Sequence, residues 1–104
     1  MEPVKTGIVG LGWAASGHIQ AYRGNPDCEL AAVCTTKGEK EARALAGERV
    51  AVYKDYESFL EHPGLQAVDI CTPHHLHARQ AIRAAQAGKH LLIEKPPAPS
   101  YQDL

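Results

Sequence analysis

The chain has 104 residues, and 11 Lys and Arg against 12 Asp and Glu give it a formal net charge of −1. Such scattered charge argues against a nucleic-acid partner or an anionic membrane surface, and no apolar stretch approaches the roughly 20 residues that span a bilayer. With no secretory signal and an odd set of cysteines (Cys28, Cys34 and Cys71), we expect one cytoplasmic domain with reduced thiols and no bound metal.

The first element is a short apolar strand, residues 4–9, which runs directly into Gly-x-Gly-x-x-Ala and a helical pattern. Gly10 permits a tight turn, Gly12 lets a phosphate approach the backbone, and Ala15 is small enough for close packing of the helix on the strand. The helix then presents its N–H groups and positive dipole end to the phosphates. Glycines also mark ordinary turns, but a strand before and a helix after this one favour a dinucleotide site.

Strands and helices alternate along the rest of the chain. We predict further strands at 29–34, 50–53, 65–71 and 90–93, with helices at 14–23, at 37–46, after Asp55, and between Pro73 and Gly88. This alternation predicts an α/β fold with a doubly wound parallel sheet, and right-handed crossovers give the strand order 3-2-1-4-5. The apolar spacing predicts that Ala42, Leu45 and Ala46 face inward and that Ala78, Ile82 and Ala85 form one apolar side of the last helix.

Polar segments follow four of the five predicted strands. They are the glycine loop, Thr35-Thr36, Thr72-Pro73-His74 and Glu94-Lys95-Pro96. In parallel sheets, ligands bind beyond the carboxyl ends of the strands, here at the switch between the first and fourth strands. We therefore expect these four segments to meet around one ligand.

The end of the second strand bears on the choice of cofactor. Folds that prefer NAD place Asp or Glu there for the ribose hydroxyls, but the segment 34–40 has no carboxylate at that position. Thr35 and Thr36 can donate hydroxyl hydrogen bonds to a 2′-phosphate, and Lys37 or Lys40 can neutralise it. The pattern predicts NADP, with NAD as the alternative if both lysines are only exposed residues of a first helical turn.

Three motifs together carry a resemblance to a known family. They are Gly10-Leu11-Gly12-Trp13-Ala14-Ala15 with His18 downstream, then the segment 72–77, then Ala87 to Pro96. With these, the chain resembles the N-terminal domain of the Gfo/Idh/MocA oxidoreductases over nearly its whole length. The resemblance implies a Rossmann-like fold and an NAD(P)-dependent enzyme that oxidises a sugar or polyol hydroxyl or runs the reverse reaction. A few members act on dihydrodiols or tetrapyrroles.

The resemblance also implies roles for individual residues. Lys95 matches the catalytic lysine beside the reacting hydroxyl, where an ammonium can stabilise developing negative charge. The implied cofactor-binding residues are Gly10, Gly12, Trp13, Ala14, Ala15, Thr35, Thr36, Lys40, Cys71, Thr72, Pro73, His74, His77, Glu94, Lys95 and Pro96. His74 stands where the family commonly has asparagine. The alternative for His74, His75 and His77 is a solvated helix start, and their spacing argues against zinc.

Family enzymes are much longer than this chain, because a second domain binds the substrate and forms oligomer contacts. The resemblance therefore implies that residues 1–104 are the cofactor domain of a two-domain homo-oligomeric enzyme whose substrate is a sugar, polyol or diol. The alternative is a stand-alone dinucleotide-binding module, a sensor or partner subunit without turnover.

Overall fold

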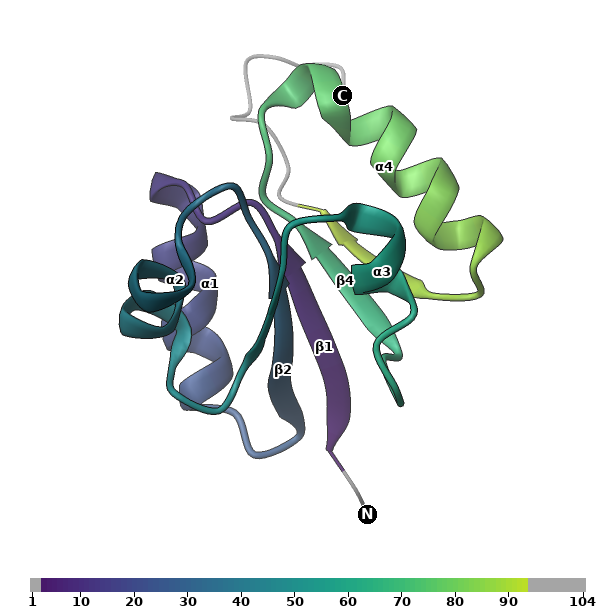
Figure 1. The fold of residues 1–104 in the computed structure, drawn as a ribbon. Coiled ribbons are helices and arrows are strands. Elements are labelled where there is room, and N and C mark those ends of the chain that lie inside the picture. The colour runs from purple at the N-terminus through teal and green to yellow at the C-terminus, as the bar shows by residue number, and fades with distance from the viewer. Residues whose placement is uncertain (1–2, 94–104) are drawn as a thin grey trace, which may run out of the picture.

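A five-stranded parallel sheet forms the centre of the molecule (Figure 1). The computed structural model describes residues 3–93, and at 13, 14, 74, 92 and 93 it describes the backbone alone. The strands are β1 (Val4–Val9), β2 (Cys28–Cys34), β3 (Ala51–Tyr53), β4 (Ala67–Ile70) and β5 (His90–Ile93). Their order is β3-β2-β1-β4-β5 with every pair parallel, which confirms the predicted topology.

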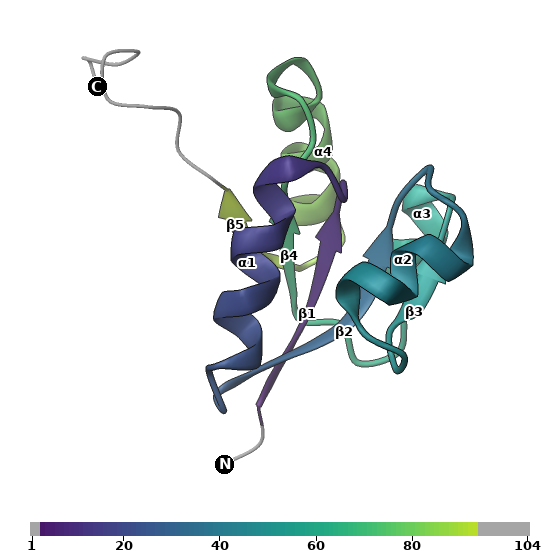
Figure 2. The same cartoon turned by 90° about the vertical axis from the view of Figure 1, so that its left-hand side faces the viewer.

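Helices cover both faces of this sheet. They are α1 (Trp13–Arg23), α2 (Glu39–Ala46), α3 (Tyr56–Leu60) and α4 (His74–Gln86). Figure 2 views the sheet from the side of α1 and α2, and α4 lies behind the strands. Strands covered on both faces need apolar side chains, and β1, β2 and β4 bury residues such as Ile8, Val33 and Val68. Thr6 and Asp69 are buried polar residues of these strands. In residues 3–93 no helix has the length and hydropathy needed to cross a membrane.

Two apolar cores result, one on each face. The core under α1 and α2 contains mostly small and branched residues, among them Ile8, Ala15 and Val33. The core under α3 and α4 is built around Phe59, which no solvent reaches, with Val68 and Ile70. Burial of these side chains supplies the main favourable term that holds the helices to the sheet.

Helix α4 turns a different face to the sheet from the one predicted from its apolar residues. Ala84 is fully buried, whereas Ile82 is 60% exposed and Ala78 and Ala85 are also exposed. That prediction was wrong because the inward stripe of α4 includes a polar residue, Gln80, whose side-chain oxygen accepts from the hydroxyl of Thr72, and this bond offsets its burial.

A similar correction applies to α2. Of the three residues predicted to face inward, Ala42 and Ala46 are buried as predicted, but Leu45 is 42% exposed. Small residues on the inward face allow α2 to lie close to β2 and β3, so the larger side chain is left at the edge of the contact.

Candidate functional site

A cleft of ≈ 450 Å³ opens at the carboxyl edge of the sheet, where β1, β2, β3 and β4 end. The described residues that line it are Val9, Gly10, Leu11, Gly12, Cys34, Thr35, Thr36, Lys37, Lys54, Tyr56, Thr72, Pro73, Leu76 and Gln80. The chain leaves β1 toward β2 and leaves β4 toward β5, in opposite directions along the sheet, so the cleft lies at the topological switch between β1 and β4. Open parallel sheets bind ligands at such positions.

Backbone hydrogen bonds join the loops that frame the cleft. The N–H of Gly10 donates to the carbonyl of Cys34 over 2.9 Å, and the N–H of Cys71 donates to the carbonyl of Val9 over 2.9 Å. The N–H of Thr35 donates to the carbonyl of Tyr53 over 3.0 Å. Each bond continues the ladder of the sheet past the end of a strand, so the frame of the cleft is part of the sheet.

Gly10 and Gly12, the first two glycines of the loop, are needed for different reasons. Gly10 has a φ of +93°, and a Cβ there would lie 2.8 Å from Cγ2 of Thr72 and 3.0 Å from the backbone of Cys71. Gly12 has no described atom within 4 Å of such a Cβ, so no packing requires a glycine there. The space beside Gly12 is open to the cleft, and a side chain would enter the space that a bound phosphate needs.

The N-terminus of α1 has backbone amides to offer an anion. Its N-cap is Gly12, no side chain among the described residues caps it, and its first turn has no acidic residue. Amides without an internal partner at a helix start favour phosphate. Trp13 and Ala14 begin this turn, and only their backbone is described. Ala15 is 2% exposed and packs onto the sheet, so it supports the turn from below and does not line the cleft.

The end of β2 brings hydroxyls and one lysine to the cleft. Thr35 is buried and its Oγ1 accepts from the N–H of Lys37 over 3.1 Å, while Thr36 is exposed. Nζ of Lys37 lies 3.5 Å from the carboxylate of Glu41, one turn further along α2. Lys40 is exposed on α2 and is not among the described residues that line the cleft.

The end of β4 supplies the opposite wall. Thr72 and Pro73 line the cleft, and Oγ1 of Thr72 donates to Oε1 of Gln80 over 2.5 Å. Nε2 of His77 donates to the backbone carbonyl of Thr72 over 2.5 Å, so this ring fixes the strand end to α4. His74 is the first residue of α4, and only its backbone is described.

Cys71 lies on the α1 side of β4, within a polar cluster. Asp69 is 1% exposed, and its Oδ2 lies 2.5 Å from Nδ1 of His18 and accepts from the hydroxyl of Tyr22 over 2.6 Å. The thiol of Cys71 donates to Oδ1 of Asp69 over 3.5 Å. Burial, and then the bond to Asp69, raise the pKa of Tyr22, so its hydroxyl stays protonated.

His18, Asp69 and Cys71 present ligand-type atoms that all lie within 4.8 Å of one another. Two ligands of one tetrahedral zinc, each about 2.0–2.2 Å from the ion, stand roughly 3.3 Å apart. The 2.5 Å between His18 and Asp69 is instead a charge-assisted hydrogen bond. We therefore treat the cluster as a hydrogen-bonded network that joins α1 to β4.

Two titratable groups of the cleft are held neutral. Burial, with a smaller effect of Asp55, raises the pKa of the Cys34 thiol to about 11. Burial also raises the pKa of Tyr56 to about 12, and its hydroxyl donates to the carbonyl of Gln80 over 2.7 Å. These two groups are therefore uncharged at neutral pH. The charged residues that line the cleft are the lysines at its rim, Lys37 and Lys54.

Seven of the described lining residues had no role in the sequence prediction of the site: Val9, Leu11, Cys34, Lys54, Tyr56, Leu76 and Gln80. Lys54 had a usable signal, because it directly follows β3 and all parallel strands end at one edge. Leu76 and Gln80 had none, since their positions depend on the orientation of α4. Glu94, Lys95 and Pro96, the predicted catalytic segment, lie outside the described residues.

This fold and cleft define a class of protein, the dinucleotide-binding domains of Rossmann type. Residues 4–104 match the family model described as "Oxidoreductase family, NAD-binding Rossmann fold". The chain therefore belongs to the Gfo/Idh/MocA oxidoreductase family, which confirms the resemblance drawn from its three motifs.

Two relatives and one solved structure illustrate the similarity. Levoglucosan dehydrogenase of Pseudarthrobacter phenanthrenivorans is 36% identical over 92% of this chain and 27% of its own length. D-glucoside 3-dehydrogenase of Escherichia coli is 33% identical over 93% of this chain and 28% of its own. A 3-ketoreductase from Actinomadura kijaniata, solved with NADP and TDP-benzene, has a TM-score of 0.81 at 30% identity over 90% of this chain and 29% of that one. The chain thus spans less than a third of each.

Proposed function

We propose that residues 1–104 form the cofactor domain of a dehydrogenase that prefers NADP and acts on a hydroxyl carbon of a sugar, polyol or diol. The observation that carries the proposal is the cleft at the β1–β4 switch, with an open space at Gly12 and an uncapped helix start beside it. The two sugar-directed relatives support the substrate class, and the NADP bound to the related 3-ketoreductase supports the cofactor.

Each part of the cleft has a role in this proposal. The amides at the start of α1 bind the pyrophosphate, for which Gly12 leaves room. Thr35 and Thr36 bind the adenosine ribose and its phosphate at the end of β2. The described lining residues include no carboxylate, and a carboxylate there would repel a 2′-phosphate.

The bound nicotinamide would accept or donate the hydride. Lys95, in the segment Glu94-Lys95-Pro96, would hold the substrate hydroxyl by its Nζ and exchange a proton with it, with Glu94 and Pro96 positioning the lysine. The remaining binding residues in the proposal are Trp13, Ala14, Cys71, Thr72, Pro73, His74 and His77, with Lys40 near the phosphate. A substrate domain and oligomer contacts would come from chain outside these 104 residues.

The binding step is testable with the substitution Gly12→Asp. Asp is a favourable N-cap residue and no described atom lies within 4 Å of the new Cβ, so the fold should be retained. The carboxylate would occupy the phosphate position and weaken NADPH binding by about two orders of magnitude, as measured by fluorescence titration.

Gly17→Asp is the matched control, because Gly17 lies exposed on the same helix and has the same free space around its Cβ. It should bind NADPH like the native chain. Equal binding by the Gly12 variant, or no binding of either dinucleotide by the native chain, would refute the proposal. Tighter binding of NADH than of NADPH would refute the NADP preference alone.

A further inference from the structure

Lys54 follows β3 directly and lines the cleft at the edge of the sheet opposite β5. Its Nζ donates to the backbone carbonyl of Thr36 over 3.3 Å. This bond joins the end of β3 to the loop after β2. Under the proposed function, the 2′-phosphate of the adenosine ribose of NADP would lie at that loop. An ammonium carries three donors, so this bond leaves others for a ligand.

The other lysines near this rim are less well placed. Lys37 lines the cleft, but the carboxylate of Glu41 lies 3.5 Å from its Nζ. Lys40 is exposed on α2, away from the described lining residues. Among residues 3–93, Lys54 is a lining cation for which no ion pair is found.

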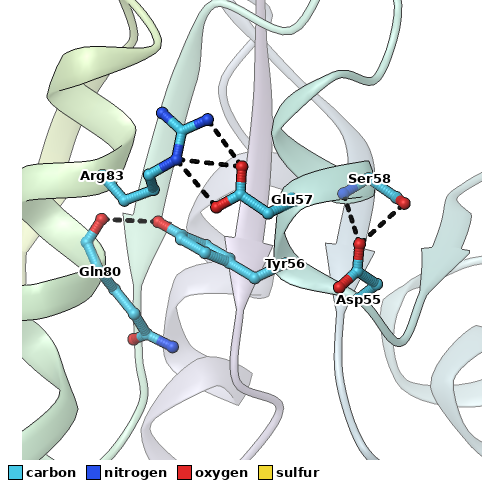
Figure 3. A network of polar contacts seen from close by, with 6 residues as sticks. All are labelled: Asp55, Tyr56, Glu57, Ser58, Gln80 and Arg83. Carbon is cyan, nitrogen blue, oxygen red and sulfur yellow. Dashed lines mark hydrogen bonds and ion pairs between the residues drawn. The ribbon is translucent and has the colours of Figure 1, made fainter.

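The neighbouring acid does not compete for Lys54. Asp55 follows it in sequence, but Oδ2 of Asp55 accepts from the N–H and the hydroxyl of Ser58, at 3.0 and 2.9 Å, and caps α3 (Figure 3). With Cys34 and Tyr56 held neutral, the described lining residues add no negative charge beside Lys54. The charge of Lys54 is therefore available to an anion.

We propose that Lys54 is a specificity-determining residue whose ammonium binds the phosphate that distinguishes NADP from NAD. The inference rests on the proposed function, because it assumes that this cleft holds the adenosine end of the dinucleotide. Discrimination between NADP and NAD then comes from the end of β3 as well as from the loop after β2. A charge-assisted bond of this kind corresponds to roughly tenfold to a hundredfold in affinity.

The test compares Lys54→Gln with Lys54→Arg in the 104-residue chain. Gln keeps a donor for the carbonyl of Thr36 but loses the charge, whereas Arg keeps both. We expect Lys54→Gln to weaken NADPH binding about tenfold or more with less than about twofold change for NADH. Lys54→Arg should retain the native ratio. The fragments 2′,5′-ADP and 5′-AMP should show the same contrast, because they isolate the adenosine end.

Lys5→Gln is the control for the loss of one positive charge, since Lys5 is exposed at the opposite, amino end of β1. It should leave both affinities unchanged. If the native chain prefers NADPH and Lys54→Gln keeps that preference, or weakens NADH equally, the assignment of Lys54 is overturned while the proposed function stands. If the native chain binds neither dinucleotide, the proposed function fails and this inference with it.

Discussion

The two faces of the sheet hold their helices by different means. Under α1 and α2 the core is made of small and branched side chains, and the network of Asp69, His18 and Tyr22 crosses it from β4 to α1. Under α3 and α4 the core is built around the ring of Phe59, and the charged contact lies outside, between Glu57 and Arg83. The α1 and α2 face thus contains a buried carboxylate held by hydrogen bonds, whereas the α3 and α4 face packs around a large buried ring and keeps its ion pair at the surface.

The ion pairs on the two faces should contribute differently to stability, because one is buried and the other is exposed. A carboxylate that is 1% exposed needs its donors, because each one lost leaves the buried charge less well compensated. An ion pair whose side chains are 41% and 52% exposed is screened by water and salt. The face under α1, the helix that follows the glycine loop, depends on the first kind of contact.

The largest effect should follow from Asp69→Ala. His18 and Tyr22 would lose their shared acceptor inside the protein, and we expect the free energy of unfolding to fall by about 3–5 kcal/mol. Urea denaturation measures this. Asp55→Ala is the control, since it removes an exposed N-cap and should cost only about 1 kcal/mol. Equal losses in the two variants would remove the contrast between the faces.

Gly7→Ala tests the packing around Phe59 in the core under α3 and α4. A Cβ at Gly7 would lie 2.6 Å from the ring of Phe59 and 3.1 Å from Cδ1 of Leu65, so we expect a loss of about 1–3 kcal/mol. The same substitution in a Phe59→Leu background should cost less, because the smaller side chain makes room. Gly17→Ala, with free space around its Cβ, should instead stabilise α1 slightly. An unchanged cost in the double variant would argue against the ring as the obstacle.

Acid should weaken the α3 and α4 face through His62. Burial, then the charges of Lys5 and Lys89, lower the pKa of His62 below its ordinary value of 6.5, and Nδ1 shares a 2.8 Å hydrogen bond with Tyr53. The unfolded chain therefore binds this proton more readily, so stability falls as the pH drops below 6.5. Thermal unfolding between pH 7.5 and 5 should show a shallower decline for His62→Gln. Parallel declines in the two proteins would contradict this.

The smallest effect is expected from Glu57→Gln. Two nitrogens of Arg83 donate to the carboxylate of Glu57, at 2.6 to 3.0 Å (Figure 3). These hydrogen bonds to Glu57 raise the pKa of Arg83, yet both side chains are exposed to solvent. We expect a loss of stability well below that of Gly7→Ala. This small loss should disappear in 1 M NaCl, because salt then screens charges over a Debye length of about 3 Å. A loss that persists at high salt would mean that packing, not charge, joins α3 to α4 here.

Much of the fold was predictable because local signals and topology rules agree. The turn at Gly10 and the apolar strands set the order of the sheet, and the structure confirms that order. The partners of Asp69 were not predictable, since His18 and Tyr22 are 51 and 47 residues away in the sequence. The position of Lys54 follows from the common edge of parallel strands, yet its bond to Thr36 depends on side-chain geometry that periodicity does not carry.

The backbone bonds from Gly10, Thr35 and Cys71 that extend the sheet past its strand ends have a consequence for the choice of coenzyme. They fix the rim of the cleft by main-chain atoms, whatever side chains the rim carries. Under the proposed function, a change of coenzyme would then require only substitutions at exposed rim positions, because the main-chain frame stays intact. Redesign of coenzyme preference would begin with the rim residues Thr36 and Lys54 and leave the glycines unchanged.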